Sequence, residues 1–434
     1  MELALTIGII TGACVCLFVI FKPELKIGKI KAGTYWLVSL VGAIILLSCG
    51  VMPWEYVKNG LFSDAAVNPV KILVLFLSMT FISVFLDELG FFEYLAEKAI
   101  GGGGKTQRGL FIKLYALVSV LTVFTSNDII VLTFTPFICC FAKNAKINPV
   151  PYLFAEFIAA NTWSMCLIIG NPTNIYLATA ANIDFWKYFA VMVLPTVFAG
   201  ITSFLLLLLI FKRPLSESLC GEKSEKKKID RPLVVIGAVH LAVTVILLAI
   251  SSYIGLEMWV VSLSLALSLT AVSAIYSAVK KQGKKEILGA YKRLPYELVP
   301  FVLSMFVIVL ALNYTGATEE LAKVLSVGNP IWTVGSASFL AANVINNIPM
   351  SVLFSSVLSS PAFVGSGFGG VYAAIIGSNL GAFLTPVGAL AGIMWLSLLK
   401  RSEVKISFGK FILIGGAVAI SSLIAALAGV CIVL

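Results

Sequence analysis

Long apolar segments make up most of this chain, and four of them are interrupted near the middle by polar residues. The eight continuous segments lie at about 4–21, 34–51, 68–89, 190–211, 232–252, 256–276, 294–314 and 406–433. Each is close to the roughly 20 residues that a helix needs to cross a bilayer. The interrupted segments lie at about 107–142, 150–180, 331–360 and 370–399. With 59% hydrophobic and 12% charged residues, the chain is predicted to be an all-α polytopic membrane protein.

The positions of the basic residues predict how these segments cross the membrane. We take 107–142 and 331–360 as re-entrant hairpins, and 150–180 and 370–399 as broken helices that cross. Of the 31 Lys and Arg, four then lie on one side, namely Lys58, Lys71, Lys187 and Lys323. The other 27 share the opposite side, which the positive-inside rule makes cytoplasmic. This arrangement predicts about ten transmembrane helices, external termini and insertion in the cytoplasmic (inner) membrane, and it explains the net charge of +10 without nucleic acid.

Five crossings and one hairpin in each half predict two inverted repeats, because an odd number of crossings turns the second half upside down. The repeats are residues 1–215 and 232–434, joined by a polar cytoplasmic linker at 216–231. Two internal matches support this division. Residues 85–96 match 311–322 at Leu, Gly, Glu, Leu and Ala, and the sequence at 168–174 returns in altered form at 375–381.

The tips of the two hairpins are polar. They read Thr125-Ser126-Asn127-Asp128 and Asn346-Asn347-Ile348-Pro349. A chain reversal inside hydrocarbon needs partners for its free backbone groups. The side chains of Ser126, Asn127, Asn346 and Asn347 can supply them, and the same oxygen atoms can coordinate a cation or hold a polar solute. Capping of helix ends is the alternative role.

The broken helices are predicted to supply complementary chemistry. Gly170 and Pro172 in the first half, and Gly377, Gly381 and Pro386 in the second, are expected to end helices near the middle of the bilayer. The half-helix after each break would point free N–H groups and a positive dipole end inward. The predicted binding residues at the breaks are Gly170, Asn171, Thr173, Asn174, Gly377, Ser378, Asn379 and Thr385.

Asp128 is the strongest candidate for ion coupling. A carboxylate at the bilayer centre costs at least about 2.5–3.5 kcal/mol, so it is normally paired, hydrated or functional. It could carry a proton, or bind a sodium ion together with Ser126 and Asn127. Its counterpart in the second half is the apolar Ile348.

A second acidic position, Asp87, aligns with Asn313 in the internal match. Both acidic positions therefore belong to the first half, which we expect to handle the coupling ion. Asp87 and Glu88 could instead lie at the interface beside Lys98.

Three motifs resemble the arsenical-pump membrane protein (ArsB/NhaD) branch of the ion transporter superfamily. They are Leu86–Glu93, the Asn127-Asp128 tip followed by Thr135-Pro136, and Gly381–Leu390. The resemblance covers nearly the whole chain in order. It implies an inverted-repeat fold with a scaffold and a mobile transport domain, an elevator mechanism, a homodimer, and a substrate framed by the hairpin tips and broken helices.

The chain departs from this pattern in two places. Arsenite exporters usually carry small residues after the Asn-Asp pair, where this chain has Ile129-Ile130-Val131. The break at Gly170–Asn174 is closer to anion permeases of the same superfamily.

Together these features predict a secondary active transporter for a small polar solute or oxyanion, with arsenite- or antimonite-like efflux favoured and a proton or sodium gradient as the energy source. Sodium-coupled uptake of a dicarboxylate or other anion, and sodium/proton antiport, are the alternatives, and an ion channel is a more distant one. One histidine and no clustered carboxylates argue against an enzyme. No nucleotide-binding motif is present, so energy would come from a gradient or from a separate cytoplasmic ATPase subunit. No cofactor beyond a sodium ion is expected.

Overall fold

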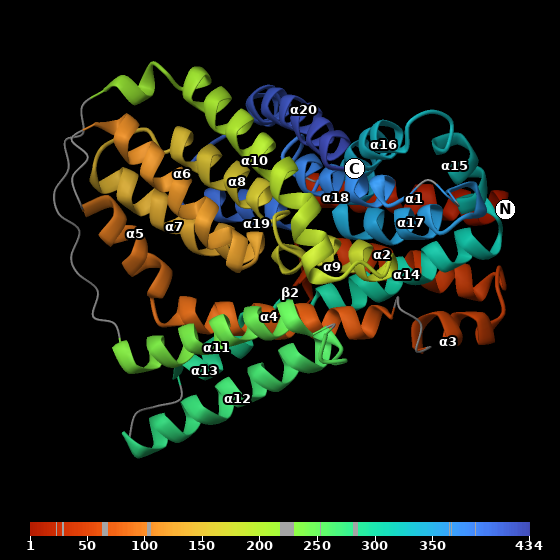
Figure 1. Cartoon of the computed structure of the whole chain (residues 1–434), viewed down its shortest axis with the longest axis horizontal. Coiled ribbons are helices and arrows are strands. Elements are labelled where there is room, and N and C mark those ends of the chain that lie inside the picture. The colour runs from red at the N-terminus through yellow and green to blue at the C-terminus, as the bar shows by residue number, and fades with distance from the viewer. Residues whose placement is uncertain are drawn as a thin grey trace.

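The computed structural model describes residues 1–22, 24–27, 30–62, 68–101, 106–217, 230–251, 253–280, 285–363, 365, 367–386 and 388–434. These residues are nearly all helical (Figure 1). The elements of the first half are α1 Glu2–Phe21, β1 Glu24–Ile27, β2 Ile30–Gly33, α2 Thr34–Ser48, α3 Trp54–Phe62, α4 Pro69–Glu88, α5 Phe91–Gly101, α6 Gln107–Phe124, α7 Asn127–Asn144, α8 Val150–Trp163, η1 Ile168–Gly170, α9 Pro172–Ala180, α10 Phe185–Ile210 and η2 Pro214–Ser216.

The second half is built in a similar way. Its elements are α11 Arg231–Ile250, α12 Met258–Val279, α13 Lys285–Lys292, α14 Leu298–Tyr314, α15 Ala317–Leu325, α16 Pro330–Ile345, α17 Asn347–Leu358, η3 Pro361–Phe363, α18 Gly369–Gly381, α19 Leu390–Arg401 and α20 Phe408–Val433. Most of the expected linker at 216–231 lies outside the described residues. Both chain ends lie in the right-hand half of Figure 1, and α5 lies at the left.

Each continuous apolar segment forms one helix, but length alone identifies fewer crossings than expected. Among the described residues, six helices are long and apolar enough to span a membrane, or seven if α14 and α15, bent by 80° at their junction, are one span. The expected ten included α1, α2 and the two broken helices. Helix α2 and the pieces of the broken helices are too short for the same criterion, and α1 counts only over Glu2–Phe18. One of the six, α6, belongs to the expected first hairpin, so the finer count stays a prediction.

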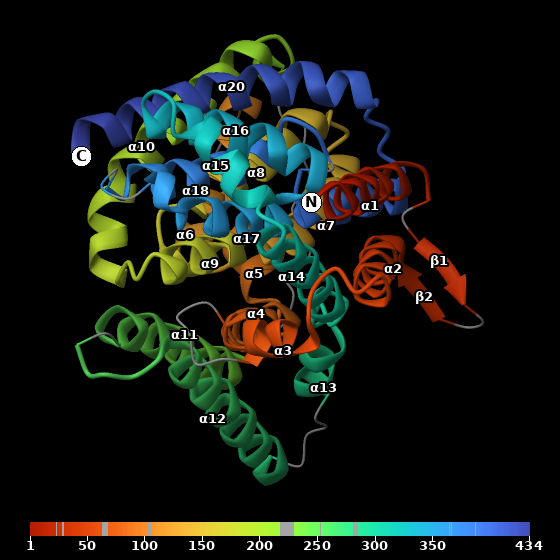
Figure 2. The same ribbon diagram turned by 90° about the vertical axis from the view of Figure 1, so that its right-hand side faces the viewer.

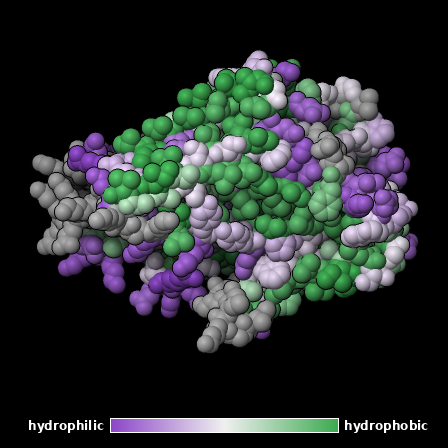
Figure 3. Space-filling view, turned by 90° about the horizontal axis from the view of Figure 1, so that it is seen from below, coloured by the Kyte–Doolittle hydropathy of each residue, from purple (hydrophilic) through white to green (hydrophobic). Residues whose placement is uncertain are grey.

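The outer helices carry apolar side chains on their exposed faces. Exposed large hydrophobic residues recur along four of them: Ile201, Leu205 and Leu209 of α10, Val235, Val239 and Ile246 of α11, Leu267 and Ile275 of α12, and Leu413, Ile420 and Ile424 of α20. Figure 3 shows hydrophobic residues over much of the middle of one face, with hydrophilic residues gathered toward its ends. Such a surface is stable in lipid and costly in water.

The helices form two groups, which are separated most clearly in Figure 2. One, the central bundle, consists of α6–α10 and α16–α20, with the closest packing between α16 and α18 and between α10 and α20. The other, the flanking helices, consists of α1–α4 and α11–α14, where α4 packs on α12 and α2 on α14. Helices α9 and α17 of the bundle contact α4 and α14 of the flank. All four interrupted segments therefore belong to the central bundle.

A small antiparallel sheet corrects the expectation of a purely helical chain. Strands β1 and β2 pair with Leu25 opposite Ala32 and Ile27 opposite Ile30. The segment alternates apolar and basic residues, as in Ile30-Lys31-Ala32, which is the period of a strand. The segment lies between the apolar segments at about 4–21 and 34–51, where no strand was predicted.

The second break lies later in the chain than the internal match placed it. Helix α18 continues through Gly377 to Gly381, and α19 begins only at Leu390. Gly377 is a packing residue rather than a helix terminator, because a Cβ there would lie 2.7 Å from both the carbonyl oxygen of Gly335 and the amide nitrogen of Phe339 in α16. A glycine inside a helix thus allows α16 and α18 to approach closely.

Candidate functional site

The tip of the first hairpin docks on the end of α8. Ser126 precedes α7 and Asn127 begins it, and both side chains are buried. The Asn127 side-chain amide donates to Oδ1 of Asn161 at 3.0 Å. Asn161 in turn donates to the carbonyl oxygen of Phe157 at 2.8 Å. Sequence analysis missed Asn161, although an asparagine in an apolar helix was a usable signal.

The two broken helices meet at the side chain of Asn379 in α18. Its Oδ1 accepts hydrogen bonds from Oγ of Ser164 at 2.9 Å and from Nδ2 of Asn171 at 3.0 Å. Its Nδ2 donates to Oδ1 of Asn174 at 2.7 Å and to the carbonyl oxygen of Ile375 at 2.8 Å. These polar groups, from segments about 200 residues apart in the sequence, form one buried network.

The same asparagines stabilise the backbone of the first break. Nδ2 of Asn174 donates to two carbonyl oxygens of the break, at 2.9 and 3.2 Å. Asn171 caps α9 by accepting from the backbone N–H of Thr173 at 3.2 Å. Gly170 lies in η1, where a Cβ would overlap the carbonyl oxygen of Ser164. Backbone groups that leave a helix in an apolar interior need such partners.

The tip of the second hairpin docks on the second break. Asn346 adopts a positive φ of 71° and caps α17, and Asn347 begins that helix. The backbone N–H of Asn347 donates to the carbonyl oxygen of Gly388 at 3.1 Å. Asn343 of α16 accepts from the backbone N–H of Thr385 at 3.0 Å and from its hydroxyl at 2.7 Å. Asn343 is a second site residue that sequence analysis missed.

Three predicted binding residues carry a buried oxygen atom that has no hydrogen-bond partner among the described residues. These atoms are Oγ1 of Thr173, Oγ of Ser378 and Oδ1 of Asn347, from α9, α18 and α17. Burying a polar atom without a partner costs about 1–3 kcal/mol, so each of these oxygens is suited to accept a hydrogen bond or to coordinate a cation. Hydroxyl and amide oxygens suit a sodium ion or a solute that donates hydrogen bonds.

Asp128 lies apart from the amide network. It forms no hydrogen bond or ion pair with the described residues, and its side chain is partly exposed. It interacts electrostatically with Tyr35 of α2, whose hydroxyl donates to Glu297 at 3.1 Å. Asp128 therefore lies where the central bundle faces the flanking helices, next to Asn127 in sequence but with different surroundings.

Glu156 of α8 is a buried acid that sequence analysis also missed. Its side chain is fully buried, and the hydroxyl of Thr135 in α7 lies 3.3 Å from both carboxyl oxygens. The indole of Trp395 in α19 lies beside it. Glu156 is the only acidic residue in the apolar run at 150–163, and this was the sequence signal that could have identified it.

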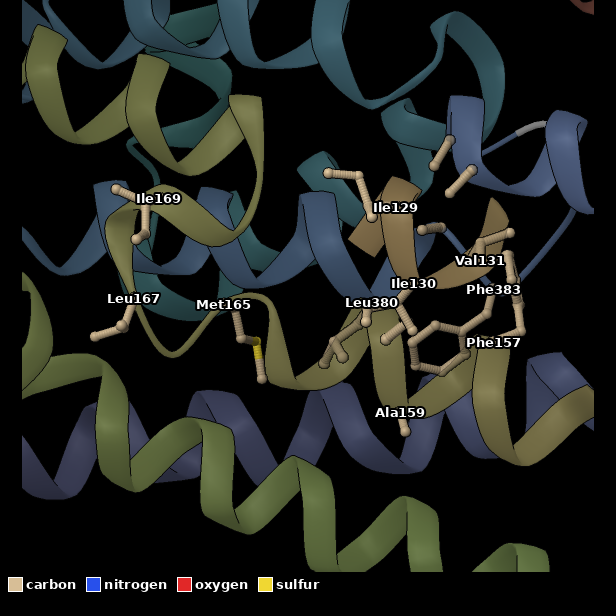
Figure 4. Close-up of a cluster of buried hydrophobic side chains, with 14 of the residues drawn as sticks. Ile129, Ile130, Val131, Phe157, Ala159, Met165, Leu167, Ile169, Leu380 and Phe383 are labelled. Carbon is tan, nitrogen blue, oxygen red and sulfur yellow. The ribbon is translucent and has the colours of Figure 1, made fainter. Parts of the chain in front are cut away.

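Buried apolar side chains occupy the same elements as the polar residues. Ile130 and Val131 of α7, Phe157 of α8, and Leu380 and Phe383 at the end of α18 gather in one buried cluster (Figure 4). No Lys or Arg is buried anywhere in the part of the chain that the structure describes. The site thus offers oxygen and amide groups without a buried positive charge to neutralise an anion.

Asp87 joins the two groups of helices at the other side of α7. Its carboxylate and that of Glu88 bind Arg293, with N···O distances of 2.6 and 2.7 Å. The alternative position at the interface beside Lys98 did not include this partner. These carboxylates raise the pKa of the Arg293 guanidinium, although burial acts to lower it. The hydroxyl of Thr133 in α7 donates to Asp87 at 2.7 Å. Asp87 therefore ties the flanking helix α4 to the first hairpin.

Comparison with known proteins agrees with the geometry. A family model described as "CitMHS: Citrate transporter" matches residues 17–369. This chain belongs to the citrate transporter family. It is 28% identical to the arsenical pump membrane protein of Escherichia coli (strain K12) over 409 residues, which cover 86% of this chain and 93% of that protein. It is also 28% identical to the arsenical pump membrane protein of Yersinia enterocolitica over 402 residues, which cover 87% and 88%.

A solved structure supports the fold. The YdaH transporter of Alcanivorax borkumensis aligns with a TM-score of 0.55 at 12% identity, and the alignment covers 99% of this chain and 97% of that one. The family and these relatives confirm the resemblance noted from the motifs, and they make this chain a multi-pass membrane transporter of the arsenical pump and citrate transporter family.

Proposed function

We propose that this protein is a secondary active transporter that exports a small neutral solute of the arsenite or antimonite type across the cytoplasmic membrane. The observation that carries the proposal is the Asn379 network, together with the three unpartnered oxygens of α9, α17 and α18. It combines groups from both halves of the chain, and no Lys or Arg is buried among the described residues. Trivalent arsenite is neutral near pH 7 and carries hydroxyl groups that can donate to such oxygens.

The names of the relatives support this substrate class. Two relatives that match most of the chain are called arsenical pump membrane proteins. At 28% identity, the names of these relatives support arsenite or antimonite as the proposed solute of this chain. We propose transport alone, and no catalysed chemical reaction, for this protein.

The mechanism follows from the positions of the candidate residues. The solute binds where Asn347, Thr173 and Ser378 present free oxygens, and the central bundle carries it past the flanking helices. Asp128 exchanges a proton or a sodium ion as its surroundings change, with Ser126 and Asn127 as the other sodium ligands in the second case. The membrane potential supplies about 2.3 kcal/mol per charge per 100 mV.

The architecture of the proposal is two inverted repeats in an elevator arrangement, inserted in the inner membrane with both termini external. The asparagines that begin α7 and α17 support matched repeats. The proposal also includes a homodimer and an optional cytoplasmic ATPase subunit.

Sodium-coupled uptake of a carboxylate is the second candidate, because the family description names citrate. An anion in this site would need bound cations to offset its charge, since the described residues place no basic side chain there. This candidate therefore requires sodium for binding, whereas the first does not.

Purified protein in vesicles distinguishes the two. We expect arsenite and antimonite, without sodium, to raise the thermal unfolding midpoint, and we expect arsenite flux to stop when an ionophore collapses the driving gradient. Stabilisation by citrate only, and only with sodium, would favour the second candidate. Arsenite flux down its own concentration gradient that persists after the proton and sodium gradients are collapsed would contradict both candidates and indicate a channel.

A further inference from the structure

Helix α17 carries a line of polar side chains that starts at the second hairpin tip. Asn347, Ser351, Ser355 and Ser359 follow at intervals of four residues, so they lie near one another along one side of the helix. Oγ of Ser351 donates to the carbonyl oxygen of Asn347 at 2.8 Å, and Oγ of Ser359 donates to that of Ser355 at 2.8 Å. Ser355 donates to Val352 at 2.9 Å.

These internal bonds decide what the line of serines can recognise. Each hydroxyl has one proton to donate and two lone pairs to accept with. The three protons are used within α17, so the hydroxyls offer mainly acceptor sites. A solute that carries O–H donors fits such a row, whereas an anion presents only further acceptors.

The outer part of this row lines an open cavity of about 390 Å³. Ser355, Ser356 and Ser359 form one wall, and Asn313 and Glu319 lie on the wall of α14 and α15. Glu319 is the only charged residue among the described lining residues. We call this cavity the vestibule. Its acidic charge repels anions, so its chemistry agrees with that of the serine row.

Tyr176 of α9 separates the vestibule from the interior. It lines both the vestibule and a second cavity of about 20 Å³, which also contacts Thr173, Ile348 and Ser351. That inner cavity has room for a single water molecule. The ring of Tyr176 contacts Phe306, and Tyr176 and Ser355 both line the vestibule. Tyr176 thus lies between the vestibule, lined by Ser355, and the inner cavity, lined by Thr173.

We propose that the vestibule and the serine row of α17 form a transit subsite for a small neutral solute with O–H donors, and that Tyr176 is the gate between this subsite and the central site. The solute class rests on the proposed function. The gate at Tyr176 does not rest on the proposed function, because it depends only on the packing of α9, α14 and α17.

Thiol accessibility tests the gate. Ser359→Cys and Ser351→Cys are each exposed to a membrane-impermeant maleimide in whole cells, with the unsubstituted protein as the background from native cysteines. We expect fast labelling of Ser359→Cys and slow labelling of Ser351→Cys. Adding Tyr176→Ala should make Ser351→Cys react about tenfold faster, and Tyr176→Leu serves where Tyr176→Ala does not assemble. Equal labelling of both positions with Tyr176 intact would overturn the gate, as would no acceleration.

Flux kinetics test the transit subsite. We expect Ser355→Ala and Ser359→Ala to raise KM for arsenite by about threefold to tenfold, the effect of losing one hydrogen bond, with kcat unchanged. Ser326→Ala is the matched control, because it removes a hydroxyl of α15 that bonds Lys323 and does not line the vestibule. Unchanged KM values in both serine variants would overturn the subsite. Absence of any arsenite flux, with the labelling pattern as expected, would instead contradict the proposed function and leave the gate standing.

Discussion

Helices α7 and α17 each begin at an asparagine after a short turn, yet they meet the flanking helices in opposite ways. On α7, Thr133 donates to Asp87, which Arg293 also binds. On α17, Ser355 and Ser359 face the open vestibule. Asn313, which the internal match pairs with Asp87, bonds Thr318 on its own side at 2.7 Å.

The difference shows how similar hairpins can serve different roles in one conformation. The contact beside α7 is closed by a polar bond between the bundle and the flank, whereas the contact beside α17 leaves room for a solute. In the proposed topology, α17 faces the outside, so this conformation gives access from the external side. An alternating mechanism would require the Asp87–Thr133 bond to break when access changes sides.

The largest expected effect comes from the acid that only the first hairpin has. Asp128→Asn should reduce gradient-driven flux in vesicles to that of empty vesicles, because the amide can neither release a proton nor neutralise a sodium ion. Glu156→Gln is the matched control and should retain flux, since glutamine still accepts from Thr135. Normal flux by Asp128→Asn with unchanged pH and sodium dependence would remove the proposed asymmetry in coupling.

The anchoring of the second hairpin gives the next largest effect. Gly377→Ala should lower the free energy of unfolding by about 1–3 kcal/mol, because its Cβ would press on the α16 backbone at Gly335 and Phe339. Thermal unfolding in detergent measures this. Gly409→Ala in α20, where a Cβ has nothing within 4 Å, should leave the midpoint unchanged or raise it. Equal midpoints for both variants would show that α16 and α18 can separate without cost.

The bond that closes the α7 side should have an intermediate effect. Thr133→Val removes a hydroxyl whose single proton is shared between Asp87 and the carbonyl oxygen of Ile129. Its loss should cost about 1 kcal/mol and should shift the population toward the conformation open on that side. Thiol labelling of Ser359→Cys would report this as slower reaction. Thr270→Val, which removes a hydroxyl bonded to Tyr291 within the flanking helices, is the control. Faster labelling in Thr133→Val would mean that the bond does not hold the α7 side closed.

The smallest effect is expected at the opposite end of α4. Lys71 binds Glu257 at 2.9 Å, but the Glu257 side chain is 56% exposed, so Glu257→Gln should cost less than about 1 kcal/mol. The hydrogen bond from Lys71 lowers the pKa of Glu257. Its small stabilisation is therefore present above the unfolded-state pKa and is lost as pH falls through the folded-state pKa. Urea unfolding at several pH values checks this; a loss well above about 1 kcal/mol at neutral pH would contradict the small contribution expected of this exposed pair.

The sequence predicted the helices and the polar tips well, because apolar length and interrupting asparagines are local signals. It misplaced the second break, because a glycine that ends a helix and one that admits a neighbouring helix look the same without the neighbour. Gly377 is the second kind. Asn161, Asn343 and Glu156 were missed since each lies inside an apparently regular helix, and only packing reveals the tip or hydroxyl that each one meets.

The serine row of α17 was readable as spacing but not as chemistry. Intervals of four residues place Ser351, Ser355 and Ser359 on one side of a helix, yet only the structure shows that their protons are already committed. In the same way, the sequence alone could not predict that Asp87 would bind Arg293 rather than Lys98, since the partners are 206 residues apart.

The fully bonded amide of Asn379 has a consequence for substrate choice. With two bonds accepted and two donated, its orientation is fixed and it has no capacity left for a ligand. The Asn379 side chain links the two halves of the site. A change in which solute this protein carries is therefore to be sought at Thr173, Ser378 and Asn347, whose oxygens are uncommitted, while replacement of Asn379 would loosen the site without changing its selectivity.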